Sequence, residues 1–158
     1  MGRPVTNIAK LNNGGTIMKT GQEYRDSLRS RNIKVYIKGQ LLDSKDVIDH
    51  PFIRGHVNSA AMTYELAEDP QYEDLMTATS HLTGKKINRF THMHQSTDDL
   101  IKKVKMQRLL GQYTASCFQR CVGMDAINAV YSSTFETDEA CGTKYHDNFK
   151  KWLARIQK

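Results

Sequence analysis

Two cysteines one helical turn apart are the residues whose chemistry the sequence suggests most clearly. Cys117 and Cys121 lie in the run TASCFQRCVGMDAINAVYS, whose apolar and small residues predict a buried central helix over about 112–131. Side chains four positions apart share one face of a helix, so two thiolates can converge on one soft metal centre, either zinc or an iron–sulfur cluster. Because both kinds of site usually need four ligands, this helix supplies at most half of one.

Two further interpretations of this pair stay open. A free cysteine inside an apolar helix is often only a small hydrophobic residue, and Arg120, which could stabilise thiolate charge, is also typical of a solvated helix surface. His92 and His94, in the run THMHQ, are local candidates for further zinc ligands, although such a pair is also typical of a polar loop. A zinc-stabilised helical interaction module built on Cys117, Cys121 and these histidines is therefore one hypothesis.

Other candidate residues give weaker signals. A basic run on one predicted helix indicates a solvated face, with phosphate or coenzyme A contact as the alternative; its members are Lys102, Lys103, Lys105 and Arg108. Tyr64 is most simply a core residue, but its phenol could donate a hydrogen bond near a flavin or acyl pocket. The sequence contains no glycine-rich phosphate loop and no Ser/His/Asp arrangement.

The elements that must position these residues are mostly helical. Thr20 and Glu23 have the spacing of a capping box, Ser96 precedes two acids at a helix start, and Pro51 is expected at the first position of another helix. Residues 34–38 predict a short strand, and 80–96 predict a long connection. The fold class expected is mainly α, a bundle whose helices cover 20–31, about 51–68, 72–79, about 97–110, about 112–131 and 143–158.

Composition and charge exclude several classes of function. The chain has 158 residues, about one domain, and no run of the roughly 18 apolar residues that a membrane-spanning helix needs. Residues 1–40 carry 8 − 2 = +6 and residues 41–158 carry 15 − 15 = 0, so the basic charge belongs to an N-terminal arm. This pattern argues against nucleic-acid binding. Three cysteines, including Cys141, and no export signal favour a reducing compartment, so we expect a cytoplasmic protein.

Three segments carry a resemblance to a known family. They are DHPFIRGHVNSAAMTYELAEDPQYEDLMT (49–77), HQSTDDLIKKVKMQRLLGQ (94–112) and TASCFQRCVGMDAINAVYS (114–132). Together they closely resemble the 4-hydroxybutyryl-CoA dehydratase family, whose members also have vinylacetyl-CoA Δ-isomerase activity and are related to flavin-dependent 4-hydroxyphenylacetate 3-hydroxylases. The resemblance covers about residues 20–158, and its CFQRC element is specific to the dehydratase branch.

The resemblance implies an acyl-CoA dehydrogenase-like fold with an N-terminal helical domain, a middle β domain and a C-terminal helical bundle. Residues 20–158 match the N-terminal helical domain alone, and residues 1–19 are expected to form a flexible lead-in. The remaining domains are therefore expected as partners, in the same or a companion chain, within a homotetramer. Acyl-CoA substrate is expected, whereas nucleic acid and membrane are not.

The resemblance also implies FAD and a 4Fe–4S cluster in the complete enzyme. Cys117 and Cys121 match two of the family's four cluster ligands, while His92, His94 and Cys141 do not match the others. The implied reaction is the radical dehydration of 4-hydroxybutyryl-CoA to crotonyl-CoA, in which one-electron transfer to the flavin makes the β-hydrogen acidic. We expect the isolated chain to be inactive and to hold neither cofactor intact; a flavin-dependent aromatic hydroxylase-like domain is the alternative within the superfamily.

Overall fold

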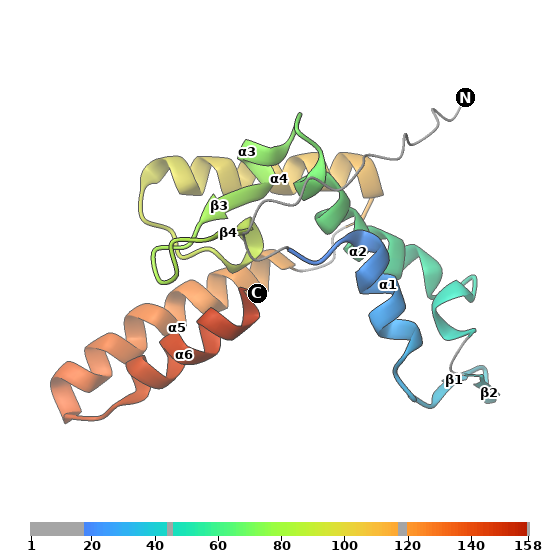
Figure 1. The fold of residues 1–158 in the computed structure, drawn as a ribbon. Helices are drawn as coiled ribbons and strands as arrows, with labels where there is room; N and C mark the ends of the chain where they lie inside the picture. The colour runs from blue at the N-terminus through green and yellow to red at the C-terminus, as the bar shows by residue number, and fades with distance from the viewer. Residues whose placement is uncertain (1–17, 44–45, 117–119, 158) are drawn as a thin grey trace.

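Helices dominate the part of the chain that the structure describes. The computed structural model describes residues 18–43, 46–116 and 120–157, without the side chains of residues 120 and 121. The elements follow in the order α1 (Gly21–Arg29), β1 (Val35–Ile37), β2 (Gln40–Leu42), the 3₁₀ turn η1 (Val47–Asp49), α2 (Arg54–Glu68), α3 (Glu73–Met76), β3 (Thr77–Thr79), β4 (Lys86–Asn88), η2 (Arg89–Thr91), α4 (Thr97–Thr114), α5 (Arg120–Cys141) and α6 (Tyr145–Ile156). In Figure 1, α1 and α2 lie at one side, α5 and α6 project together at the other, and α4 lies above the short strands.

The capping predictions are confirmed. The Glu23 amide donates to Thr20 Oγ1 at 3.0 Å, and the Thr20 amide donates to Glu23 Oε2 at 2.9 Å, which is a complete capping box. At the start of α4, the Asp99 amide donates to Ser96 Oγ at 3.2 Å. Local side-chain chemistry therefore determines where both helices begin.

The prediction that Pro51 opens a helix is wrong, because α2 begins three residues later, at Arg54. His50 directs the intervening turn: its carbonyl accepts from the amides of Ile53 at 2.8 Å and Arg54 at 2.9 Å, and its Nδ1 accepts from the Phe52 amide at 3.2 Å. Proline at this turn has no amide to leave unpaired, and the α-helix starts once the turn is complete.

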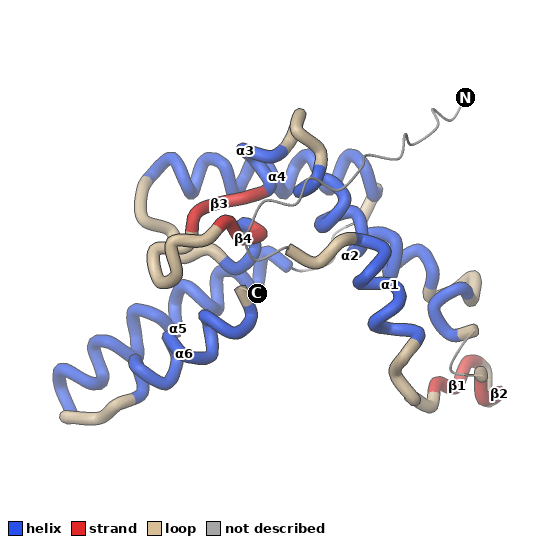
Figure 2. Tube along the Cα trace, in the orientation of Figure 1, coloured by secondary structure: helices blue, strands red, loops and turns tan. Residues whose placement is uncertain are grey.

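The strand prediction is confirmed at β1 and incomplete elsewhere (Figure 2). β1 pairs with β2 across Lys38 and Gly39, whose φ values of 50° and 81° suit a tight hairpin turn. The helix expected over 72–79 ends at Met76, and its last three residues form β3 instead. β3 pairs antiparallel with β4, which lies inside the segment 80–96 that is predicted to be a plain connection. Each strand has three residues, too few for the sequence to show an alternating pattern.

The helix predicted over 112–131 is two helices. α4 continues through Gly111 to Thr114, the chain turns at Ala115 with a left-handed φ of 49°, and α5 begins at Arg120. The expectation of a buried central helix is also wrong for the described residues of α5 up to about 131, since Val122 and Val130 are 63% and 42% exposed. Apolar residues lie on several sides of α5. Among the described elements, the one that packs most extensively against α5 is a single helix, α6.

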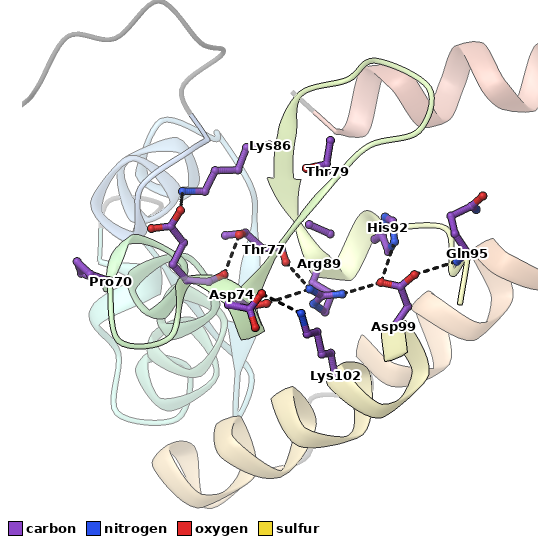
Figure 3. A pocket seen from close by; sticks show the side chains of 12 residues that line it. Pro70, Asp74, Thr77, Thr79, Lys86, Arg89, His92, Gln95, Asp99 and Lys102 are labelled. Carbon is purple, nitrogen blue, oxygen red and sulfur yellow. Dashed lines mark hydrogen bonds and ion pairs between the residues drawn. The ribbon is translucent and has the colours of Figure 1, made fainter. Parts of the chain in front are cut away.

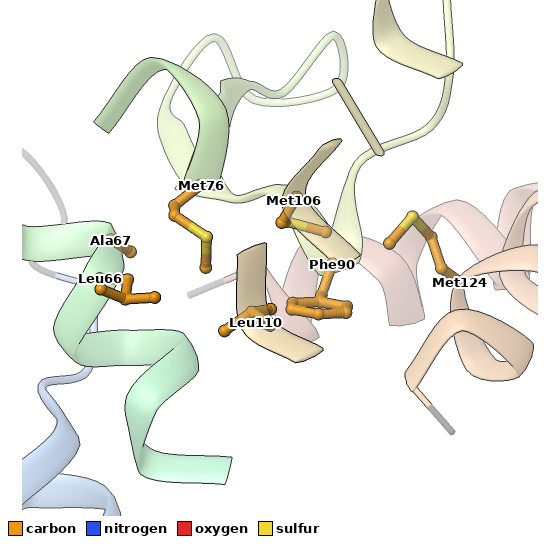
Figure 4. Packing of buried hydrophobic residues seen from close by; sticks show 7 residues of the cluster. All are labelled: Leu66, Ala67, Met76, Phe90, Met106, Leu110 and Met124. Atoms are coloured by element: carbon orange, nitrogen blue, oxygen red, sulfur yellow. The ribbon is translucent and has the colours of Figure 1, made fainter. Parts of the chain in front are cut away.

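The core joins five elements and contains many methionines (Figure 4). It lies between α2, α3, η2, α4 and α5, and its members are Leu66, Ala67, Met76, Phe90, Met106, Leu110 and Met124. Unbranched methionine side chains fill the irregular gaps between helices that cross at different angles. This core holds η2 and the start of α5 against α4.

Candidate functional site

A buried arginine organises the polar region beside this core. Arg89 is 3% exposed, and its guanidinium donates to three backbone carbonyls: Nε to Leu75 at 2.8 Å, and Nη2 to Asp74 at 3.0 Å and Thr77 at 2.6 Å. Its Nη1 donates to Asp99 Oδ1 at 3.1 Å (Figure 3). Arg89 therefore ties α3 and β3 to the first turn of α4, and its charge is paired as burial requires.

Asp99 is the anion at the centre of this network. Its Oδ2 accepts from the Gln95 amide at 3.0 Å and from Ser96 Oγ at 3.2 Å, and its Oδ1 lies 3.2 Å from His92 Nε2. Burial raises the pKa of the Asp99 carboxyl, but the hydrogen bonds from Gln95 and His92 outweigh it and hold the pKa at about 2. Asp99 is therefore ionised at every pH near neutrality.

A hollow of about 720 Å³ opens next to these residues. Its walls carry charges of both signs that pair with one another: Lys86 contacts Glu73, and Lys102 contacts Asp74 at 2.8 Å. Hydrogen bonding and attraction to Lys102 lower the pKa of Asp74. These pairs neutralise the walls, so the hollow lacks the excess of one charge that would select an ionic ligand.

His92 and His94 lie close together, with ring centroids 6.5 Å apart. His92 is 4% exposed and faces Asp99 through Nε2, while its Nδ1 is buried without a hydrogen-bond partner. Burial, with Lys103 next in importance, lowers the pKa of His94, whose Nε2 is also buried without a partner. Among the described residues, no group of three His, Cys, Asp or Glu side chains could hold a metal ion.

The interface between α4 and α5 carries the other polar contacts of this region. Lys103 forms an ion pair with Asp125 across it. Asn128 accepts from the His94 amide at 2.9 Å and donates to the His92 carbonyl at 3.3 Å. Gln107, one turn beyond Lys103, has a buried Nε2 without a hydrogen-bond partner. The Lys103 and Asn128 contacts therefore join the first half of α5 to α4 and to the segment that leads into α4.

The cysteine prediction stays untested. Cys117 lies outside the described residues, and Cys121 is placed by its backbone alone, in the first turn of α5 with Arg120. Cys141, at the end of α5, is an exposed free thiol.

The remaining sequence candidates have structural contacts. Tyr64 stacks on Tyr24 with ring centroids 5.3 Å apart, in agreement with a packing role. Lys102 and Lys103 are held by carboxylates, as in an ion-paired helix face. His146, which the sequence analysis does not single out, is also buried, and its Nδ1 lies 3.1 Å from Thr134 Oγ1.

Sequence reasoning misses Arg89, Asp99 and Asn128. The sequence shows Asp99 only as a helix-start acid, and Arg89 lies in a segment predicted to be a connection. An arginine beside Phe90 in a polar run gives no signal of burial, because its partners are backbone carbonyls supplied by distant elements.

Within the described ranges, none of the helices has the length and apolar character needed to cross a bilayer.

Comparison with known proteins gives one family match and several related proteins. The family described as 4-hydroxyphenylacetate 3-hydroxylase N terminal matches residues 20–158. A Clostridium aminobutyricum protein named 4-hydroxybutyryl-CoA dehydratase/vinylacetyl-CoA-Delta-isomerase is 60% identical over 141 residues, which are 89% of this chain and 28% of the relative.

Two other relatives extend this comparison. The solved structure of an oxygen-tolerant archaeal 4-hydroxybutyryl-CoA dehydratase from N. maritimus is 49% identical with a TM-score of 0.80, over 88% of this chain and 27% of that one. The oxygenase component of 4-hydroxyphenylacetate 3-monooxygenase from Thermus thermophilus is 28% identical over 71% of this chain and 22% of its own length. The chain thus spans between 22% and 28% of these three relatives.

Proposed function

Because the chain belongs to the 4-hydroxyphenylacetate 3-hydroxylase N-terminal family, we propose that it is the N-terminal segment of a 4-hydroxybutyryl-CoA dehydratase with vinylacetyl-CoA Δ-isomerase activity. The observation that carries this assignment is the 60% identity with the Clostridium enzyme, against 28% with the Thermus monooxygenase component. The helical fold, which corresponds to the N-terminal part of an acyl-CoA dehydrogenase-like dehydratase, supports it. The proposed reaction removes water from 4-hydroxybutyryl-CoA and yields crotonyl-CoA.

Within this function, Cys117 and Cys121 are two of the four ligands of a 4Fe–4S cluster, and other segments supply the remaining ligands and the FAD site. Thiolate is the donor that such clusters require, and Cys117 and Cys121 stand four positions apart in the sequence, the spacing of one helical turn. When bound, the cluster and the flavin supply the Lewis-acid and one-electron chemistry that removes an unactivated β-hydrogen.

The described residues have a positioning role in this proposal. Asn128 joins α5 to the segment that leads into α4, and the Lys103–Asp125 pair fixes the two helices relative to each other. The Arg89–Asp99 network then anchors the first turn of α4 to α3 and β3. A rigid support of this kind keeps cluster ligands in a fixed geometry.

The same proposal includes the wider organisation of the enzyme. Residues 1–19 form a lead-in and 20–158 form the N-terminal helical domain, which works with a middle β domain and a C-terminal helical domain in a cytoplasmic homotetramer. What supports this organisation is the small share of each relative that the chain spans, 28% for the Clostridium enzyme and 27% for the archaeal one.

Anaerobic assay of the native protein that contains this chain tests the function. Incubation with 4-hydroxybutyryl-CoA should give crotonyl-CoA, identified by chromatography, and vinylacetyl-CoA should isomerise to the same product. A parallel incubation with 4-hydroxyphenylacetate, oxygen and reduced flavin should give no hydroxylated product. Hydroxylation without dehydration would instead assign the chain to the aromatic hydroxylase branch.

A further inference from the structure

The outer face of α4 carries apolar side chains that the described residues leave uncovered. Leu100, Ile101 and Val104 are 47%, 48% and 46% exposed. The opposite face of the same helix enters the core through Met106 and Leu110, which are fully buried. A helix that is apolar on two faces is typical of one that packs between two bodies. The core of this domain is one of these bodies, and the outer face of α4 indicates a second.

The two ends of this outer face carry opposite charges. Asp98, near the start of α4, keeps 68% of its side chain exposed, although it contacts Lys102 of its own helix at 3.4 Å. Lys105 and Arg108 follow the apolar residues along the helix, and both are exposed. Among the described residues, no carboxylate forms an ion pair with either of these two cations. An acid, an apolar centre and two bases therefore succeed one another along the face.

This order of residues is complementary to itself when two copies of α4 pack in opposite directions. Ile101, Val104 and Arg108 share one stripe of the helix because they are three and four positions apart, and Asp98 lies at the border of that stripe. With a two-fold axis between Ile101 and Val104, each Ile101 faces the partner's Val104, and Arg108 reaches the partner's Asp98. A contact between identical surfaces requires a patch that is complementary to itself in this way.

We propose that the outer face of α4 is an interface between two copies of this chain, in which Ile101 and Val104 are buried and Arg108 pairs with the partner's Asp98. This inference deepens the homotetramer of the proposed function, on which it rests, by assigning one of its contacts to a named surface. Charge complementarity favours a second copy as the occupant, because the two-fold axis brings each acid to a base. A parallel arrangement of the two helices places like charges side by side.

A charge exchange tests this pairing in the native protein that contains the chain. Arg108→Glu and Asp98→Arg each place like charges across the two-fold axis, so we expect copies to exchange between assemblies at least about tenfold faster than in the wild type. The double variant restores opposite charges and should exchange at close to the wild-type rate. Native mass spectrometry of mixed ¹⁵N-labelled and unlabelled protein measures the rate, and Arg31→Glu is the control for an exposed arginine elsewhere. Equal rates in all variants, or a double variant that exchanges faster than both single ones, would overturn the proposal.

A photo-crosslink identifies the occupant without altering these charges. The photoreactive residue p-benzoylphenylalanine in place of Val104 should cross-link to α4 of a second copy and give a species of twice the chain mass. The same residue in place of Gln71, exposed outside this face, should give no cross-link to α4. A cross-link from position 104 to another domain of its own chain contradicts the interface. Neither readout requires turnover, so a protein that dehydrates 4-hydroxybutyryl-CoA without this contact contradicts the interface alone, and one with the contact but without dehydration contradicts the proposed function.

Discussion

At the scale of single residues, the least tolerant position is Arg89. Burying a guanidinium is unfavourable unless its charge is paired and hydrogen-bonded, and here three carbonyls and one carboxylate accept hydrogen bonds from it. The partners come from α3, β3 and α4, so one side chain determines how three elements meet. Arg89 therefore stabilises the fold mainly by donating hydrogen bonds to these buried acceptors, and less through the attraction within one ion pair.

Replacing this side chain should destabilise the protein strongly. We expect Arg89→Met to lower the free energy of unfolding by about 3–5 kcal/mol, because Asp99 and the carbonyls lose a buried donor. Urea unfolding of the purified protein measures the change. Arg31→Met, at an exposed position, is the control and should stay within about 0.5 kcal/mol of wild type. A small effect at Arg89 would show that the network does not support the fold.

Asp99 gives this network a pH dependence. Its pKa is lowered from 3.8 to about 2, so the folded state binds fewer protons than the unfolded state in this range. The stabilisation, about 2 kcal/mol, is complete above the unfolded pKa and is lost as the pH falls from about 4 through about 2. The difference in unfolding free energy between wild type and Asp99→Asn should therefore shrink across this window. A difference that stays constant from pH 5 to about pH 2 would contradict this assignment.

At the scale of elements, the sequence predicts where α1 and α4 begin because the determinants of these two starts are local. The Thr20–Glu23 box and the Ser96 cap are short-range contacts, and the structure has both. The β3–β4 hairpin depends on pairing between Thr77–Thr79 and Lys86–Asn88, which three-residue strands do not reveal in sequence. The hollow and the Arg89 network are equally hidden, because they exist only where separate elements meet.

The close approach of α1 and α2 is another packing constraint that exists only where separate elements meet. A Cβ at Gly21 would lie 2.6 Å from Glu65 Cγ and 3.1 Å from the Ala61 carbonyl oxygen. Gly21→Ala must displace Glu65, which forms an ion pair with Arg25 at 2.7 Å. We expect a loss of about 1–2 kcal/mol in the free energy of unfolding, measured in urea.

The same substitution elsewhere is the matched control. Gly55 lies in α2, where an added Cβ would meet nothing within 4 Å beyond its own helix backbone and chain neighbours. Gly55→Ala should therefore be neutral or stabilise the helix by up to about 1 kcal/mol. Equal effects at Gly21 and Gly55 would show that α1 does not approach α2 this closely.

At the scale of the whole molecule, α5 and α6 expose apolar side chains. This exposure is consistent with a domain that packs against other domains of a larger enzyme. Val122, Val130, Phe135 and Trp152 are each more than 40% exposed. A helix with apolar residues on several sides is typical of burial in a larger core. In the proposed enzyme, the remaining domains cover this surface.

The chain should therefore lack function when it is produced alone. Residues 1–158, expressed without further segments and purified anaerobically, should not dehydrate 4-hydroxybutyryl-CoA, because the proposal assigns the flavin site and the other cluster ligands to further segments. The native protein, assayed beside it, is the control. Turnover by the isolated chain would show that the chemistry does not depend on additional segments.

The central claim is that Cys117 and Cys121 are two ligands of a 4Fe–4S cluster. Iron and acid-labile sulfide in the anaerobically purified native protein, with and without Cys117→Ser and Cys121→Ser, test it most directly, and Cys141→Ser serves as the control for an exposed thiol. The wild type and the control should contain about four of each per copy of the chain, and the two ligand variants should lose most of both. A wild type that contains zinc without sulfide, or a double variant that keeps a full cluster, would contradict the account.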